Sequence, residues 1–296
     1  MEWFIFALLS TSMFAVCNVI DKFNLTKKIK NPYSYNILGL SLNIFPVLFL
    51  IFYLNLNFDF SSLLSILYGF AFAFLYILYN KAMTKEEASR VISISRISPI
   101  FVLTMSFIFL HEVLSYQKYL GIIFLVSSAI LISYKKTKKK FSLSTGIILV
   151  LFYALGLATM GIIAKYNLSN IEYWAFYFWN LVGNILGGLF LILIPSLRKN
   201  LISEVSRIDI KTWLSVLSSD IFSWAGYIFY FIALSISFVS LLSAVFSFQP
   251  LIVFIITLIL TIRRPKILKE EINRKSLLFK SLAFVFVIIG SYLIAA

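Results

Sequence analysis

The chain alternates between long apolar stretches and short polar or charged ones, and this alternation predicts its secondary structure. A helix needs about 20 residues to cross the roughly 30 Å hydrocarbon layer of a membrane, and most of the apolar stretches have about that length. The run 122–126 is apolar at every position, whereas a membrane-spanning strand alternates apolar and polar side chains. We therefore predict an all-α integral membrane protein with ten transmembrane helices, at 3–20, 34–56, 62–80, 89–110, 117–134, 143–164, 173–195, 212–234, 238–262 and 277–295.

Composition and charge sharpen this picture. With 61% hydrophobic and 13% charged residues, the 296-residue chain does not resemble a water-soluble globule. Of the 26 Lys and Arg residues, 23 fall in the connections between helices 1 and 2, 3 and 4, 5 and 6, 7 and 8, and 9 and 10. Because cytoplasmic loops collect Lys and Arg, this distribution places those connections in the cytoplasm and both termini outside. The net charge of +14 is therefore an orientation signal and no nucleic-acid partner is predicted.

Short matches between the two halves predict an internal repeat. They occur in the same order in both halves and pair 18–25 with 161–168, Asn43-Ile44 with Asn184-Ile185, 76–79 with 227–230, and Pro99 with Pro250. We predict a first five-helix repeat at 1–134, a basic linker at 135–142 that also touches anionic lipid headgroups, and a second repeat at 143–296. Five crossings are an odd number, so the second repeat enters the membrane inverted, which is typical of transporters.

Part of the first half resembles a known family. The segments Ser98 to Phe101, Phe109 to Leu114, Tyr119 to Gly121 and Ala129 to Ile132 are similar to the fourth-to-fifth-helix signature of the EamA type of the drug/metabolite transporter superfamily. The resemblance implies a carrier with a central cavity lined by helices 1, 3, 4, 6, 8 and 9, and with helices 5 and 10 at the periphery. It also implies cytoplasmic termini, opposite to the charge count, so the sidedness stays open. The second half departs from the pattern, with Arg263 near the position of the expected glutamate.

Two ionisable residues lie deep in predicted helices, where charge costs several kcal/mol on insertion scales. Arg96 precedes Pro99 by one turn, and Asp220 lies within the eighth predicted helix. In one interpretation Arg96 binds an anionic group of a substrate and Asp220 takes a proton or an amine. In the other, the two residues neutralise each other and hold the helices together. Every other carboxylate is expected at a helix end or in a loop, which leaves Asp220 as the deep candidate for carrying a proton.

Further candidate contacts surround the expected cavity. Tyr76 and Tyr79 are matched by Tyr227 and Tyr230, and such rings either stack on a solute or anchor the protein at the membrane interface. Pro99 and Pro250 each remove a backbone hydrogen bond, so we expect kinks that shape or gate the site. Lys22 and Lys165 either flank the cavity mouths or extend toward the interface. The remaining substrate-binding candidates are polar or aromatic and comprise Asn18, Ser93, Trp224, Ser247 and Gln249.

The sequence favours a secondary carrier of a small organic metabolite, amino-acid-like or anionic, working by alternating access in the cell (plasma) membrane. One histidine, His111, and one cysteine, Cys17, give no metal or catalytic cluster, so we predict no cofactor, no metal and no enzymatic activity. Two alternatives remain: an intramembrane enzyme acting on lipid-linked substrates, and a non-transporting scaffold. The direction of transport, the coupling ion and a homodimeric state are not readable from the sequence.

Overall fold

The computed structural model describes residues 2–86, 88–95, 97–133, 144–263 and 274–295, without the side chains of 88–90, 93, 129–130, 132–133, 274–280 and 295. Within these residues the secondary structure is helical, which confirms the all-α class. The elements are α1 (Glu2–Lys27), α2 (Pro32–Leu42), α3 (Ile44–Leu50), α4 (Phe60–Lys85), α5 (Ala88–Ser95), α6 (Ser98–Leu110), α7 (Tyr116–Ser133), α8 (Thr145–Leu168), α9 (Tyr173–Leu193), α10 (Pro195–Val205), α11 (Ile210–Ile236), α12 (Val239–Val245), the 3-10 helix η1 (Phe246–Phe248), α13 (Gln249–Arg263) and α14 (Arg274–Ala295).

The chain is an integral membrane protein by the length and composition of its helices. Among the described residues, seven helical segments are long and apolar enough to cross a membrane, and the two shorter apolar helices are Ser98–Leu110 and Ser281–Ile294. A helix satisfies its own backbone hydrogen bonds, which a spanning segment must do because the hydrocarbon layer offers no water. The predicted count of ten spans and their inverted repetition stay predictions at this point.

Polar side chains mark where several helices begin. Asn31 accepts hydrogen bonds from the first backbone amides of α2, and Pro32 follows at a position where its missing N–H costs nothing. Asp59 caps α4 and Asp209 caps α11, in each case by accepting from the amide three residues later. Ser144 does the same for α8. These residues fix the helix starts at the edges of the apolar stretches.

Two helix boundaries differ from the sequence-based prediction. The second span was expected at 34–56, but α2 ends at Leu42 and α3 ends at Leu50, because Pro46 removes a backbone donor and 54–57 alternates Leu with Asn. The first span was expected to end near residue 20, whereas α1 continues to Lys27. Between predicted spans 7 and 8, the sequence of 197–211 is compatible with either a loop or an interfacial amphipathic helix, and the structure forms helix α10 there.

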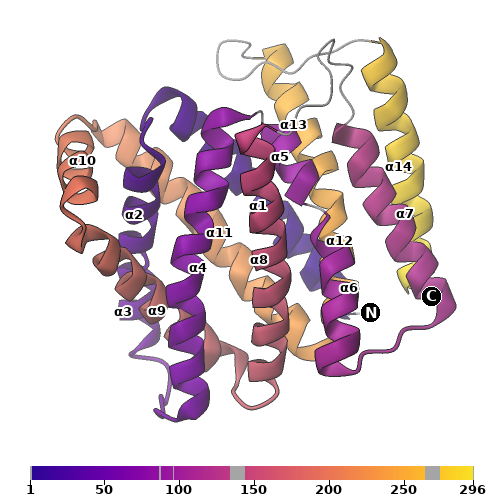
Figure 1. The fold of residues 1–296 in the computed structure, drawn as a ribbon, viewed down its shortest axis with the longest axis horizontal. Helices are drawn as coiled ribbons and strands as arrows, with labels where there is room; N and C mark the ends of the chain where they lie inside the picture. Colours follow the sequence, from indigo (N-terminus) through magenta and orange to yellow (C-terminus); the bar gives the residue numbers. More distant parts are fainter. Residues whose placement is uncertain (1, 87, 96, 134–143, 264–273, 296) are drawn as a thin grey trace.

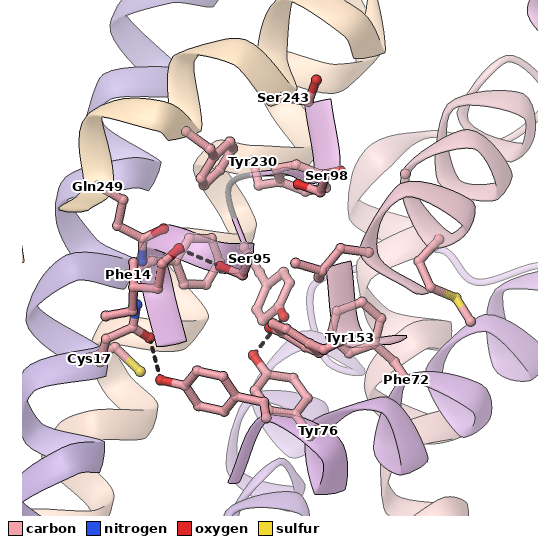
Figure 2. A pocket seen from close by; sticks show the side chains of 18 of the residues that line it. Phe14, Cys17, Phe72, Tyr76, Ser95, Ser98, Tyr153, Tyr230, Ser243 and Gln249 are labelled. Atoms are coloured by element: carbon pink, nitrogen blue, oxygen red, sulfur yellow. Dashed lines mark hydrogen bonds between the residues drawn. The ribbon is translucent and has the colours of Figure 1, made fainter. Parts of the chain in front are cut away.

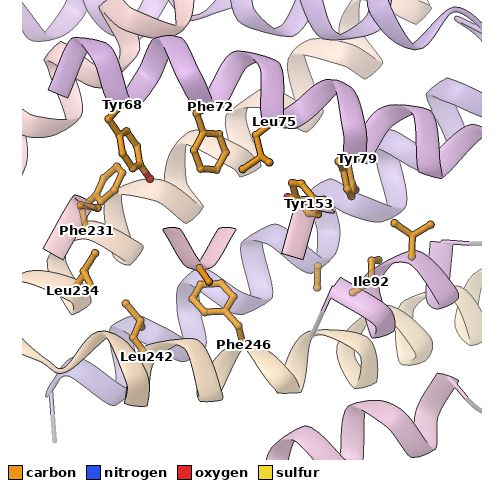
Figure 3. Packing of buried hydrophobic residues seen from close by; sticks show 14 of the residues in the cluster. Tyr68, Phe72, Leu75, Tyr79, Ile92, Tyr153, Phe231, Leu234, Leu242 and Phe246 are labelled. Carbon is orange, nitrogen blue, oxygen red and sulfur yellow. The ribbon is translucent and has the colours of Figure 1, made fainter. Parts of the chain in front are cut away.

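The helices pack in pairs around one central core. The most extensive contacts join α1 to α11, α4 to α9 and α8, and α7 to α14. Both chain ends lie on the same side of the molecule, at the lower right of Figure 1. Aromatic side chains fill much of the core, and Figure 3 shows rings of α4, α8 and α11 facing one another across it. The members of this aromatic core include Tyr68, Phe72, Tyr79, Tyr153, Phe231 and Phe246.

Two helix pairs approach so closely that they require glycine. At the crossing of α4 and α9, a Cβ on Gly69 would lie 2.0 Å from the carbonyl oxygen of Asn180, and one on Gly183 would lie 2.0 Å from that of Ile66. At the crossing of α7 and α14, a Cβ on Gly121 would lie 2.9 Å from the Gly290 carbonyl oxygen. These backbone contacts fix the distance between paired helices.

Candidate functional site

A large cavity opens in the middle of the helix bundle. It has about 940 Å³ of unoccupied space, part of it open to solvent. Its lining comes from α1, α4, α5, α6, α8, α11, α12, η1 and α13, which correspond to the predicted helices 1, 3, 4, 6, 8 and 9. This is the set of helices that the family resemblance implies, and the lining includes neither α7 nor α14. We call this space the central cavity; Figure 2 shows its aromatic and polar side chains pointing inward.

Two tyrosines from opposite halves of the chain meet in the central cavity. The hydroxyl oxygens of Tyr76 on α4 and Tyr227 on α11 are 2.8 Å apart and share a hydrogen bond (Figure 2). The rings of Phe14 and Phe72 each pack against the ring of Tyr227 in a T-shaped, edge-to-face arrangement. The sequence pairs the same two tyrosines as equivalent positions in the two repeats, so this bond joins the halves at matching points.

The other tyrosine pair of the expected site also lines the central cavity. The Tyr79 hydroxyl donates to Asn18 Oδ1 at 2.8 Å, which joins α4 to α1. Tyr230 lines the wall near Gly161, whose position matches that of Asn18 in the repeat. The two walls of the cavity are therefore similar in aromatic content and different in polar content, with an amide in the first half and a glycine in the second.

Polar groups lie near both interrupted helices. The helix ends at Ser95 before Pro99, and a 3-10 turn separates α12 from α13 before Pro250. Ser95 and Ser98, next to the break before Pro99, line the central cavity. Ser243 and Gln249, next to the break before Pro250, line it as well. Ser247 differs from the expectation, because it is fully buried and lies outside the lining of this cavity. Proline therefore accompanies both breaks, and the gating role stays a prediction.

Two of the expected contacts lie beyond what the structure describes. Arg96 is outside the described residues, and the side chain of Ser93 is also not described. The choice between Arg96 as a substrate ligand and Arg96 as the ionic partner of Asp220 therefore stays open.

Asp220 and Trp224 lie in a second cavity that adjoins the first. This second cavity has about 740 Å³ of unoccupied space between α1, α2, α4, α9 and α11. It shares six lining residues with the central cavity, so the two spaces adjoin at Cys17, Asp21, Tyr68, Phe72, Tyr76 and Tyr227. We call it the amide cavity, because five asparagines line it: Asn36, Asn43, Asn80, Asn180 and Asn184.

The amide cavity contains a carboxylate that the sequence analysis overlooked. Asp21 was expected at a helix end, but α1 continues beyond it, and the residue is 7% exposed. Its Oδ1 accepts hydrogen bonds from the Tyr35 hydroxyl at 2.6 Å and from the Ser219 hydroxyl, and Cys17 Sγ lies 3.6 Å from Oδ2. Asp220 is therefore not the single deep carboxylate, and this prediction was wrong. The signal was available, because Asp21 follows an apolar run by one residue.

Lys22 and Lys165 occupy matching positions with matching contacts. The Lys22 ammonium donates to the carbonyl oxygens of Met83 and Glu86 at the end of α4. The Lys165 ammonium donates to those of Leu234 and Ser235 at the end of α11. Each lysine thus caps a helix C-terminus, where positive charge is favourable. These contacts hold helix ends together and differ from both roles that the sequence suggested.

Glu112 forms a polar contact that spacing in the sequence does not reveal. It follows α6 and is 6% exposed, and its carboxylate accepts from the backbone amides of Val239 at 2.9 Å and Ser240 at 3.3 Å. It also accepts from the Ser240 hydroxyl. Glu112 therefore ties the end of α6 to the start of α12, where the helix dipole stabilises a negative charge.

The comparisons with known proteins agree with this geometry. Residues 1–134 match the EamA-like transporter family. This confirms the resemblance to EamA-type drug/metabolite transporters and indicates a membrane-transporter type of function. No curated protein matches the chain.

The chain also has the fold of proteins of known structure. One, described as "Crystal structure of protein", has a TM-score of 0.63 at 14% identity, covering 99% of this chain and 96% of its own. In total, 28 chains of solved structures match. At this level of identity the likeness shows a shared fold alone.

Proposed function

We propose that the protein is a secondary carrier of a small organic metabolite that binds in the central cavity. The observation that carries this proposal is the composition of the cavity wall, which combines aromatic rings with a few polar groups from both halves of the chain. Ligand sites have this composition, with apolar contact area and a small number of orienting hydrogen-bond groups. The match of residues 1–134 to transporters agrees with it.

We further propose ten membrane crossings in two inverted five-helix repeats, at 1–134 and 143–296. Packing supports this arrangement, because the contact of α1 with α11 has a counterpart in that of α8 with α4, and the contact of α8 with α6 in that of α1 with α13. The helix-capping contacts of Lys22 and Lys165 are repeated in the same way. Inverted repeats place a binding site at their interface and expose it to either side by rocking.

In this proposal the substrate contacts the hydrogen-bonded pair Tyr76 and Tyr227. Tyr79 and Tyr230, which line the same cavity, are further contacts. Asn18 and Gln249 also line the central cavity and supply hydrogen-bond groups to the substrate. The interrupted helices before Pro99 and Pro250 supply the places where the bundle bends. The substrate class is a small organic molecule with an apolar part and a polar or anionic end, and Ser93 and Arg96 are the proposed ligands for that end.

Reconstitution tests the proposed function. A thermal-unfolding screen of the purified protein against metabolite pools identifies a ligand, since a ligand stabilises the native state by an amount set by its affinity. We expect that ligand to cross the membrane of protein-containing liposomes and not of empty ones. Tyr230→Ala should reduce both binding and flux at least tenfold, whereas Tyr292→Ala, an exposed tyrosine on α14, should leave both unchanged.

The same preparation separates the alternative functions. A ligand that is converted to product in sealed vesicles would favour an intramembrane enzyme. A folded protein that binds no metabolite and carries none would contradict the carrier and favour a scaffold.

A further inference from the structure

The amide cavity differs chemically from the central cavity. Its lining contains two carboxylates, Asp21 and Asp220, and five side-chain amides, so oxygen acceptors surround a space inside the membrane-spanning bundle. No Lys, Arg or His is among the residues that line it in the described part of the chain. Carboxylates inside a membrane are costly unless a positive charge or hydrogen bonds compensate them. The proposed organic substrate does not account for this arrangement.

The two carboxylates are hydrogen-bonded to different extents. The carboxylate of Asp21 is surrounded by the Tyr35 and Ser219 hydroxyls and the Cys17 thiol. Asp220 follows Ser219 directly, and its Oδ2 is inaccessible to solvent and has no hydrogen-bond partner among the described residues. A buried acceptor without a donor is rare in native proteins and requires an explanation, of which a bound ion or water is one.

Hydrogen bonds fix the amides of this cavity, and the oxygens of Asn36, Asn43 and Asn180 each accept one. Asn36 Nδ2 donates to the Ala73 carbonyl oxygen at 3.0 Å, and Asn184 Nδ2 donates to the Asn180 carbonyl oxygen at 3.0 Å. Asn43 Oδ1 accepts from Trp224 Nε1 at 2.8 Å, which places a fluorescent ring in the wall of the cavity. Fixed carboxylate and amide oxygens are the ligands that hard cations prefer.

We propose that the amide cavity binds one monovalent positive charge between Asp21 and Asp220, and that this charge is the coupling partner of the transported solute. This inference rests on the proposed carrier function. Its chemical source is a small inorganic cation such as Na⁺, a proton, or the ammonium group of an amine. Because Asp21 and Tyr76 line both the amide cavity and the central cavity, a charge bound at Asp21 lies next to the proposed substrate site.

The titratable groups around the pair come from every neighbouring helix. They are Cys17 on α1, Tyr35 on α2, Tyr68 and Tyr76 on α4, and Tyr227 on α11, all in the lining, with Tyr79 on α4 and Tyr177 on α9 nearby. The helices α5, α12 and α13 also pack against α1, and the charged residue with a described side chain among them is Arg263, in the last turn of α13. The cysteine and tyrosines are neutral at pH 7 in their ordinary state, so the two carboxylates determine the charge of this cavity.

Cation binding to the purified full-length protein tests the inference without a gradient or an organic solute. Thermal unfolding and intrinsic tryptophan fluorescence, to which Trp224 contributes, are measured at constant ionic strength over pH 5 to 8. The salt is NaCl, methylammonium chloride or N-methyl-D-glucamine chloride. We expect one of three sources to raise the unfolding temperature and change the fluorescence: Na⁺ at fixed pH, methylammonium at fixed pH, or protons alone. Asp21→Asn and Asp220→Asn should each weaken that response at least tenfold. Glu172→Gln is the control, because Glu172 is exposed and makes no capping hydrogen bond.

The inference is overturned if none of the three sources acts on the folded wild type, or if the response persists in both Asn variants. Should Asp21→Asn fail to fold, Asp220→Asn decides the result by itself, because its Oδ2 accepts no hydrogen bond whose loss would destabilise the protein. Flux in liposomes is measured in parallel. Flux without cation binding contradicts this inference and keeps the carrier, whereas cation binding without flux contradicts the carrier.

Discussion

Single hydrogen bonds inside this protein connect helices that lie far apart in the sequence. Tyr76 and Tyr227 are separated by 151 positions, and each supplies the partner that the hydroxyl of the other needs in an apolar wall. A hydroxyl that loses its partner in such a place costs more than the bond itself contributes. The tyrosine pair is therefore a coupled unit.

Removing one hydroxyl of this pair should leave the other unsatisfied. We expect Tyr76→Phe to lower the free energy of unfolding by about 1–3 kcal/mol. Tyr227→Phe should cost a similar amount, and the double variant should cost clearly less than the sum, because it leaves no orphaned hydroxyl. Thermal unfolding of all four proteins measures the coupling. Additive costs would show that the two hydroxyls do not depend on each other.

The helix cap at Asp209 predicts a dependence of stability on pH. Hydrogen bonds from the Thr212 hydroxyl and amide hold the pKa of Asp209 below its ordinary value of 3.8. A carboxylate whose pKa is lowered by folding stabilises the native state above its unfolded pKa, and this contribution is lost as the pH falls through the folded pKa. Wild type should therefore unfold at a higher temperature than Asp209→Ala at pH 7, and the difference should shrink below pH 4.

A matched variant shows whether the cap is the cause. Glu172 occupies the same position before α9 but makes no capping hydrogen bond. The difference in unfolding temperature between wild type and Glu172→Ala should therefore not change below pH 4. An equal pH dependence in both variants would mean that general charge effects, rather than the Thr212 contacts, are responsible.

At the scale of elements, glycines set how closely helices can pair. The α4 and α9 backbones touch at Gly69 and Gly183, where a methyl group would overlap a carbonyl oxygen. Backbone atoms cannot move aside as a flexible side chain can, so the helices themselves would have to separate.

Gly183→Ala should therefore destabilise the protein, by about 1–3 kcal/mol or more if the helices cannot adjust. Gly161→Ala is the control, because its nearest contact is the Val239 Cγ2 atom at 3.3 Å, in a side chain that can shift. Thermal unfolding in one detergent compares the two. A Gly183→Ala protein as stable as Gly161→Ala would show that the α4–α9 contact is not rigid.

The elements were more predictable than the site. Apolar length alone predicts α9 nearly to its ends and locates α4 and α8, which continue beyond the predicted spans by about one turn, because the hydrocarbon layer sets that length. Polar residues were harder to interpret, since Asp21 lies only one position beyond an apolar run and still faces the interior. The contacts of Glu112 with Val239 and Ser240 link positions 127 and 128 residues apart, which no local pattern reveals.

At the scale of the whole molecule, orientation in the membrane is the open property with the simplest test. Single cysteines at Ser169 and Ser206, both exposed, probe the α8–α9 and α10–α11 connections. The native Cys17 is buried and is replaced by serine in this background. In intact cells, we expect a membrane-impermeant thiol reagent to label Ser169→Cys from outside and to leave Ser206→Cys unlabelled, as the Lys and Arg distribution predicts. The reverse result would place the termini in the cytoplasm.

The crossing of α7 and α14 at Gly121 and Gly290 is reciprocal, since a Cβ at either position would meet the carbonyl oxygen of the other glycine at 2.8–2.9 Å. Alanine at Gly121 and alanine at Gly290 would therefore widen the same gap, and once one has done so the second adds little further cost. Their effects on stability should be strongly non-additive. These two positions, 169 residues apart in the numbering, therefore constrain each other during sequence change. Once one glycine has been replaced, replacing the other should cost little further stability.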